Sequence, residues 1–232
     1  MTLGIVDNLT ASFEFAKDGL VDHWTRWILL ILLTCIPVVN FITSFIVLGY
    51  LVKIYKGGDI APELEGYGEM FINGIIFFII QFVYVFIPII LMIAGVFFAG
   101  TGVLALLAGS EGEAAVAGVA IGAASGMTGL LLILVGIVLA IIFGLIAVIA
   151  GIRFAKTERF GEGFNFGEIL ATVKKVGLGH YILSYIVFLL VGFIIALILG
   201  LIPFIGWLLT LVIIPPLILL QGKFFENLYS CA

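Results

Sequence analysis

Apolar and polar positions divide the chain into long hydrophobic runs separated by short charged segments. Residues 75–98, 129–152 and 180–201 each form such a run and contain no Asp, Glu, Lys or Arg. An apolar stretch of about 18 residues or more is long enough to cross a bilayer as a helix. The pattern therefore predicts an all-α, polytopic integral membrane protein, a helical bundle forming a single membrane domain over residues 1–232.

The stretch 24–56 decides how many times the chain crosses the membrane. It is mostly apolar, with its basic residues near the two ends, but Pro37 and Asn40 interrupt it. Proline breaks or kinks a helix and asparagine tolerates turn conformations, so we predict two spans with a turn between them rather than one span. The six predicted spans cover about residues 19–36, 38–56, 75–98, 129–152, 180–201 and 207–221.

The distribution of basic residues favours six spans over five. With six, all ten Lys and Arg residues fall on the same side as the N-terminus, whereas a single span over 24–56 would divide them between the two sides. Because Lys and Arg accumulate in cytoplasmic loops, we expect a multi-pass protein of the cell membrane with both termini in the cytoplasm. The similar hexapeptides IPVVNF at 36–41 and IPFIGW at 202–207 indicate a repeated span–turn–span unit.

Three segments between the runs predict amphipathic surface helices, at 5–20, 62–74 and 164–179. In the first, apolar residues recur at helical spacing and acidic residues lie on the opposite face. A helix with an apolar stripe on one face and charged residues on the opposite face is suited to the headgroup region of a bilayer. The alternative for this segment is a helix packed on the protein in the cytosol.

The segment 99–128 is rich in Gly and Ala and carries only two charged residues. Gly118, Gly122 and Gly126 recur every four residues, a spacing that lets helices approach closely, so we predict them as interface residues. The segment either extends the flanking spans, or forms a short hairpin, or is a low-complexity loop.

One polar stripe lies within the third span. Asn73, Gln81 and Tyr84 share a helical face with Pro88. Polar groups in hydrocarbon need partners, so this face should point toward other helices. These three residues are the candidates for ligand binding, in which case they would line a cavity. The interpretation that we favour is structural, with these side chains hydrogen-bonded between helices.

Composition narrows the function mainly by exclusion. The chain is 64% hydrophobic and 10% charged, with a net charge of −4, which excludes a nucleic-acid-binding surface. Its two histidines and two cysteines do not form a metal-ligand spacing, and no phosphate-binding loop or nucleophile elbow is present. We therefore expect no catalytic residue, no metal and no cofactor, and we expect that the protein is not an enzyme.

A set of motifs in the first half of the chain resembles a known family. They are Gly49-Tyr50 with Lys53, then Gly58, Pro62, Tyr67-Gly68-Glu69, Phe71 and Gly74, and Tyr84 with Pro88. This order is similar to that of a prokaryotic family of multi-pass membrane proteins, domain-of-unknown-function family 4013. The resemblance implies an integral membrane location and brings no activity, catalytic residue or cofactor.

Two functional hypotheses follow. The first is a non-enzymatic protein that organises the bilayer or assists assembly, with lipid and either further copies or other membrane subunits as partners; surface helices on one leaflet and the absence of charge within the spans favour it. The second is a permease for a neutral or lipid-like solute, favoured by the repeat and the polar stripe. An intramembrane enzyme is a distant third, because no catalytic constellation is found.

Overall fold

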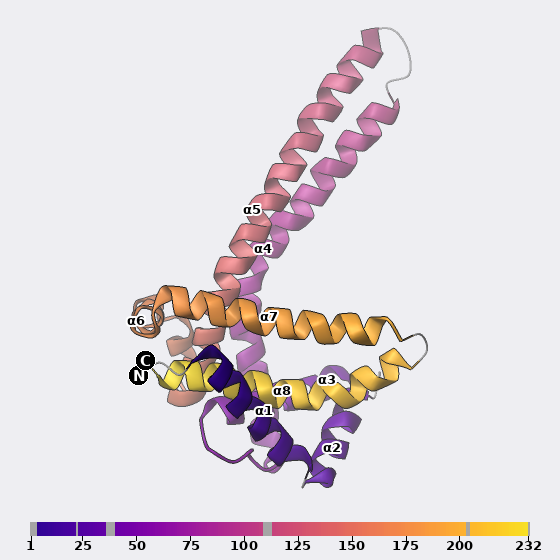
Figure 1. Ribbon diagram of the computed structural model, residues 1–232. Helices are drawn as coiled ribbons and strands as arrows, with labels where there is room; N and C mark the ends of the chain where they lie inside the picture. Colours follow the sequence, from indigo (N-terminus) through magenta and orange to yellow (C-terminus); the bar gives the residue numbers. More distant parts are fainter. Residues whose placement is uncertain (1–3, 22, 36–39, 109–112, 203–204, 232) are drawn as a thin grey trace. The chain divides into compact units, whose positions relative to one another are not determined.

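The computed structural model describes residues 4–21, 23–35, 40–108, 113–202 and 205–231, and these residues are almost entirely helical (Figure 1). The elements are α1 (Ile5–Val21), α2 (Trp24–Cys35), α3 (Asn40–Tyr55), α4 (Tyr67–Ala108), α5 (Glu113–Thr157), the 3-10 helix η1 (Phe160–Phe164), α6 (Phe166–Val176), α7 (Leu178–Gly200) and α8 (Gly206–Ser230). Among the described residues, α4, α5, α7 and α8 are long and apolar enough to cross a membrane, whereas α2 and α3 are shorter apolar helices. The all-α membrane fold is therefore confirmed.

The described chain divides into two compact units. The first unit comprises residues 1–81 and 147–232, and the second comprises residues 82–146. The long helices α4 and α5 each contribute to both units. The first unit contains α1, α6 and most of the buried side chains among the described residues, and the second is a pair of helix segments.

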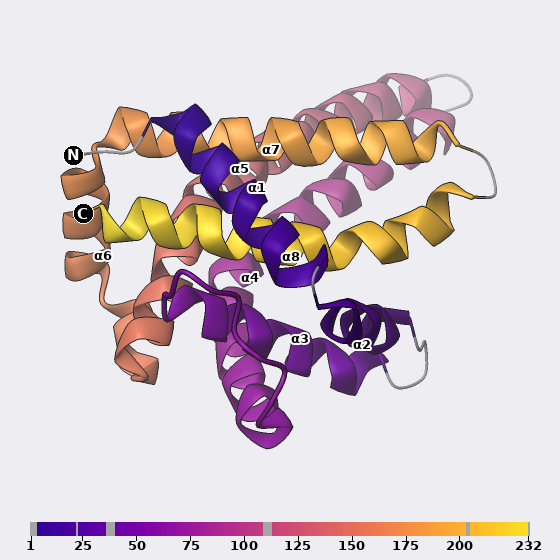
Figure 2. The ribbon, with the colours of Figure 1, turned by 60° about the horizontal axis from the view of Figure 1, so that its bottom comes forward.

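In the first unit, α1 lies across α8 (Figure 2). The face of α1 that packs against the protein includes the polar residues Asn8 and Ser12, which are 2% and 0% exposed. The predicted apolar stripe lies beside this face: Ala16 and Leu20 are buried, whereas Phe13 is 59% exposed. The helix thus packs on the protein with one edge of its apolar surface and leaves the other edge uncovered.

The turn predicted at Pro37 lies outside the described residues, but the helices around it are placed. The guanidinium of Arg26 in α2 donates a hydrogen bond to the carbonyl oxygen of Gly19 in α1, across 2.9 Å. A Cβ on Gly19 would lie 2.6 Å from the Cβ of Ala61, which follows α3. The beginning of α2 and the segment after α3 therefore lie at the same end of the unit.

Helix α4 begins later and runs further than the sequence pattern predicts. Residues 62–66 are not helical, and Gly66 takes a positive φ of 69° immediately before the first residue of the helix. From Tyr67 the helix continues through Pro88, so the surface helix predicted at 62–74 and the span predicted at 75–98 are parts of one element. Backbone hydrogen bonding persists because residues 67–74 contain no proline or other helix-breaking signal strong enough to end it.

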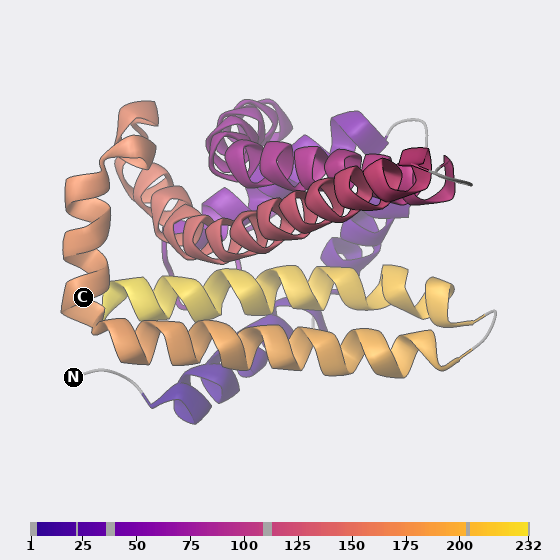
Figure 3. The same ribbon diagram turned by 90° about the horizontal axis from the view of Figure 1, so that it is seen from above.

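Helices α7 and α8 form an antiparallel pair (Figure 3). Phe188 of α7 packs against Phe224 and Phe225 of α8, with ring centroids 5.6 Å and 5.1 Å apart. Most of the remaining surface of α7 is apolar and exposed, which is the pattern of a helix that faces lipid. Helix α8 extends past the predicted end at 221 to Ser230, and α6 packs beside α7.

In the second unit, the two helix segments pack through glycines. A Cβ on Gly102 would lie 2.6 Å from the backbone nitrogen of Gly126 and 2.7 Å from the carbonyl oxygen of Gly122. Contacts this short leave no room for a side chain, so the backbones of α4 and α5 touch. The segment 99–128 is therefore helical in its described residues, extending the two flanking spans as one of the three sequence-based alternatives has it.

Candidate functional site

The polar stripe predicted on α4 does not form one continuous site. The amide of Asn73 donates to the carboxylate of Glu69 one turn earlier, at 3.5 Å on an exposed surface. Tyr84 is buried in the second unit, where its ring lies 6.4 Å from that of Phe143. Gln81 is the member of the stripe that lines a cavity.

The cavity at Gln81 measures about 260 Å³ and lies between α3, α4, α5 and α8 in the first unit. Gln81 donates from its side-chain nitrogen to the carbonyl oxygen of Ala147, across 3.0 Å. Tyr55 and Gln221 also line the cavity. The remaining lining residues are apolar. The hydrogen bond to Ala147 agrees with the structural interpretation of Gln81, and the cavity agrees with the ligand-binding one.

A buried carboxylate joins the ends of two helices. Glu226 of α8 is 5% exposed and accepts hydrogen bonds from Lys156 of α5 at 2.8 Å and from Ser230 at 2.6 Å. Lys223 contributes a second cation at 3.2 Å and also donates to the carbonyl oxygen of Gly58, which follows α3. These contacts hold the ends of α3, α5 and α8 together.

Further ion pairs lie at the ends of α3 and α5. Lys56 pairs with Glu158 at 2.6 Å and with Glu69 at 3.5 Å, while Arg153 pairs with Glu162. The hydrogen bond from Lys56 holds the pKa of Glu158 below its ordinary value, and the same bond raises the pKa of Lys56. The hydrogen bond from Arg153 likewise lowers the pKa of Glu162. These shifts favour the charged forms of Lys56, Glu158 and Glu162.

The predicted glycine interface is partly used within the chain. A Cβ on Gly122 would lie 2.7 Å from the side chain of Leu106 and 2.8 Å from the carbonyl oxygen of Gly102, so Gly122 contacts α4. A Cβ on Gly126 would meet no atom within 4 Å. Gly118 is half-buried in the same helix. Association between copies through these three glycines stays a prediction.

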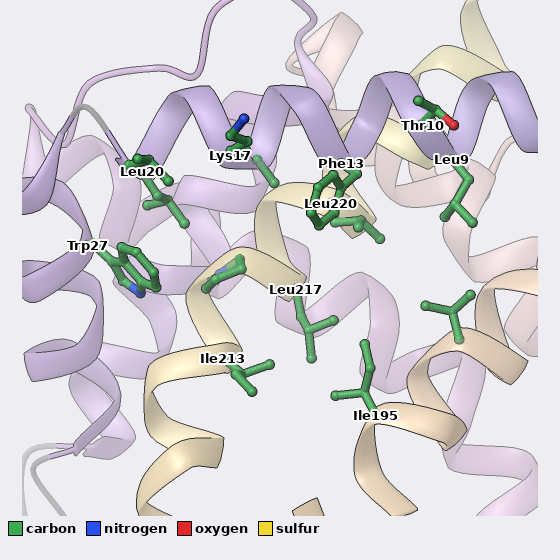
Figure 4. A pocket seen from close by; sticks show the side chains of 14 residues that line it. Leu9, Thr10, Phe13, Lys17, Leu20, Trp27, Ile195, Ile213, Leu217 and Leu220 are labelled. Carbon is green, nitrogen blue, oxygen red and sulfur yellow. The ribbon is translucent and has the colours of Figure 1, made fainter. Parts of the chain in front are cut away.

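A second hollow in the first unit is an apolar groove between α1, α7 and α8 (Figure 4). It measures about 640 Å³. Helix α1 lines it with the exposed edge of its apolar stripe, including Phe13, and Trp27 of α2 forms one wall. The indole nitrogen of Trp27 donates to the carbonyl oxygen of Val212 across 3.0 Å, which fixes the ring against α8. The lining residues are Leu9, Thr10, Phe13, Ala16, Lys17, Leu20, Val21, Trp27, Val191, Ile195, Ile213, Pro216, Leu217 and Leu220.

Sequence reasoning finds the α1 side of this groove but not the groove itself. Helical spacing identifies Leu9, Phe13, Ala16 and Leu20 as one face. The walls from α7 and α8 come from residues almost 200 positions away, which no local pattern connects to α1. Within the described residues, no three His, Cys, Asp or Glu side chains gather as they would around a metal ion; the expectations of no metal and no cofactor stay predictions.

The four long apolar helices define the chain as a multi-pass α-helical membrane protein. A family model described as "Protein of unknown function (DUF4013)" matches residues 29–204, so the chain belongs to this family. The match confirms the resemblance carried by the motifs around Gly49 and Tyr67, and it reaches well past them toward the C-terminus. No curated protein and no solved structure matches the chain.

Proposed function

We propose that this protein is a non-enzymatic organiser of the cell membrane, which inserts two amphipathic helices into the cytoplasmic leaflet. Lipid is its first partner, and further copies or other membrane subunits are its proposed protein partners. A helix that inserts shallowly into one leaflet widens that leaflet and favours curvature or local scaffolding. The function thus follows from shape and apolar surface rather than from reacting groups.

One observation carries this proposal: α1 and α6 each use only part of their apolar surface to pack on the protein. On α6, Ile169 and Val173 are buried, whereas Phe166 and Leu170 are 49% and 50% exposed. On α1, Phe13 is exposed in the same way. Large apolar side chains left uncovered beside charged residues are suited to the boundary between headgroups and acyl chains.

The topology that we propose has six spans with both termini in the cytoplasm. Helices α2 and α3 are about 18 Å and 24 Å long at 1.5 Å per residue, shorter than the hydrocarbon core of about 30 Å, so this topology requires the bilayer to thin around them. The short distance from Gly19 to Ala61 supports a hairpin, because the chain enters and leaves α2–α3 at the same end of the unit. Lys156 contacts Glu226, and Lys223 contacts Gly58. These contacts bring basic residues from distant segments to one end of the first unit, which supports their location on the same side of the membrane.

Reconstitution tests the proposal directly. Purified full chain is incorporated into vesicles of phosphatidylcholine and phosphatidylglycerol, and vesicle diameter is measured by electron cryomicroscopy. Phe13→Glu and Leu170→Glu are expected to reduce narrowing or tubulation, because a charge at these positions opposes insertion. Ala11→Glu is the matched control, since Ala11 is exposed on the charged side of α1. A charge at Ile169 of α6 would not test insertion, because this side chain is fully buried in the protein and its replacement would disturb the packing of α6.

The outcome that contradicts the proposal is equal vesicle geometry for the wild type, Phe13→Glu and Leu170→Glu. The circular dichroism spectra and the particle sizes in detergent must match among the variants. Any difference in vesicle diameter is then due to the exposed apolar edge of α1 or α6 and not to unfolding. The proposal would also be contradicted if Ala11→Glu reduced vesicle narrowing as much as Phe13→Glu does.

The second candidate function, a permease for a neutral or lipid-like solute, is favoured by the cavity at Gln81. Two amides and a phenol in an otherwise apolar cavity of about 260 Å³ are suited to a small neutral molecule. Glycerol flux into proteoliposomes, followed by light scattering, tests it for a polar solute, and transfer of a fluorescent phosphatidylcholine tests it for lipid. Gln81→Leu should reduce either flux, and flux no faster than in empty vesicles contradicts this function.

A further inference from the structure

The groove between α1, α7 and α8 has the size of a ligand site and an almost wholly hydrocarbon lining. Its volume of about 640 Å³ lies within the range of about 300–1,000 Å³ that small-molecule sites occupy. Phe13 of α1, Ile195 of α7 and Leu217 of α8 point into it from three helices (Figure 4). A molecule that fills it must therefore present a hydrocarbon surface.

Lys17 gives the groove a polar end. Among the described residues, Lys17 is the only charged side chain in the lining, and within that same part of the chain it forms no ion pair. Its ammonium points away from Ile213 and Leu217, toward the outer side of α1 (Figure 4). On α1 it lies between the groove-lining face and the exposed acidic face that carries Glu14 and Asp18.

We infer that this groove binds a phospholipid with an anionic headgroup, its phosphate beside Lys17 and an acyl chain between α7 and α8. Charge complementarity selects this occupant, because one cation at the rim of a hydrocarbon-lined groove matches a molecule with one anionic end and an apolar tail. An extended polypeptide would bring backbone polar groups that this lining does not satisfy. The inference rests on the proposed function, since it requires α1 to lie at the membrane surface, and it names the lipid class that α1 recognises.

Trp27 supplies a probe within the groove. The chain has three tryptophans, and Trp24→Phe with Trp207→Phe leaves Trp27 as the only one. Trp24 stacks on Trp27 with ring centroids 5.4 Å apart, and phenylalanine keeps an aromatic ring there. The full chain with these two changes is reconstituted in phosphatidylcholine containing increasing fractions of phosphatidylglycerol with brominated acyl chains, which quench tryptophan on contact. The reverse mixture, with bromine on phosphatidylcholine, gives the relative affinity of the two lipids.

The expected result is a preference of about fivefold for phosphatidylglycerol at Trp27, the effect of one lysine facing anionic lipid. Lys17→Gln should remove the preference and Lys17→Arg should retain it. Lys175→Gln is the matched control, because Lys175 is exposed on α6 and does not line the groove. A filled groove, made with Ile195→Phe, should lower quenching by both lipids.

Three outcomes overturn the inference, and they differ in what they say of the proposed function. Equal quenching by both lipids, unchanged in Lys17→Gln, means non-selective lipid contact and leaves the proposed function standing. Absence of quenching in a protein that light scattering shows to be dimeric assigns the groove to a second copy. Absence of quenching in a monomer places the groove outside the bilayer, and the proposed function then fails as well.

Discussion

The side-chain amide of Asn227, near the end of α8, donates a hydrogen bond to the side-chain oxygen of Asn8 on α1, across 3.0 Å. Asn8 in turn donates to the carbonyl oxygen of Phe224, also across 3.0 Å. The two asparagines lie 219 positions apart and connect the first and last helices. The amphipathic helix on which the proposed function depends is thus held on the bundle by a specific polar contact.

Replacing Asn8 should release α1 from α8. Asn8→Ala removes both hydrogen bonds and leaves the half-buried amide of Asn227 without this acceptor, which costs about 1 kcal/mol. Hydrogen exchange of the α1 amides, measured by mass spectrometry in detergent, should become faster in this variant, while exchange in α5 stays unchanged. Asp7→Asn changes the neighbouring exposed residue and is the control. Unaltered protection of α1 in Asn8→Ala would contradict this prediction.

Glu226 and Glu158 should differ sharply in their effect on stability, although both pair with lysine. Glu226→Ala leaves Lys156 and Lys223 without their buried partner, so we expect a loss of about 3 kcal/mol, the scale of breaking a buried ion pair. Glu158→Ala removes an exposed pair that solvent screens, and little change is expected. The free energy of unfolding, from titration with sodium dodecyl sulfate followed by circular dichroism, distinguishes them. Equal losses would show that burial does not decide the effect.

The glycine contact between α4 and α5 predicts a contrast between two positions one half-turn apart. Gly102→Val should destabilise the second unit by about 1–3 kcal/mol, because its side chain would overlap the backbone of Gly122 and Gly126. Gly100→Val carries the same change at a position where a Cβ would meet no atom within 4 Å, so it should be tolerated. Thermal unfolding in detergent measures both. Similar melting temperatures for the two variants would refute close packing at Gly102.

The ion pairs of Lys56 with Glu158 and of Arg153 with Glu162 predict how stability depends on pH. The lowered pKa values of Glu158 and Glu162 add stability that is complete above the ordinary carboxyl pKa of 4.5 and is lost as pH falls through the lowered values. The raised pKa of Lys56 adds stability that is complete below 10.5 and is lost at higher pH. The melting temperature should therefore change little between these limits and fall on acidification. The double variant Glu158→Gln/Glu162→Gln should fall less steeply below pH 4.5; parallel curves would speak against these pairs.

The six-span topology predicts that the segment between α4 and α5 and the C-terminal tail lie in different compartments. In a background with Cys35→Ser, native Cys231 reports the tail, and Glu111→Cys combined with Cys231→Ser reports the other segment. A membrane-impermeant maleimide should label Cys231 only in inverted vesicles and the cysteine at 111 only in right-side-out vesicles. Labelling of both positions from one side would leave the proposed orientation untenable.

Much of the secondary structure follows from local pattern. The apolar segment at 129–152 lies within α5, and the segment at 180–201 lies within α7 except for its last residue, because uncharged runs of that length have few alternatives to a helix. The segment 5–20 corresponds closely to α1. Boundaries are less predictable: α4 joins two predicted elements into one helix, since a polar surface segment and an apolar span carry the same backbone hydrogen bonds and no signal between them ends the helix.

In the candidate sites, too, some residues can be identified from local sequence and others only from their tertiary contacts. Gln81 is identified from its polar character within an apolar run, and the structure places it on a cavity. Gln221, the other amide of that cavity, lies 140 positions away on α8, and no local pattern links the two. Asn8 is likewise inconspicuous in sequence, one polar residue on an amphipathic helix, and only its contact with Asn227 shows its role.

By itself, then, the order of amino acids determined that this chain is helical and belongs in a membrane, because hydropathy and helical periodicity are properties of neighbouring residues. Tertiary structure alone decided which edge of α1 stays uncovered, which lysines hold Glu226, and that a groove exists between α1, α7 and α8. Those features require side chains from distant segments to meet, and the free energy of such meetings depends on packing geometry that no local stretch of sequence contains.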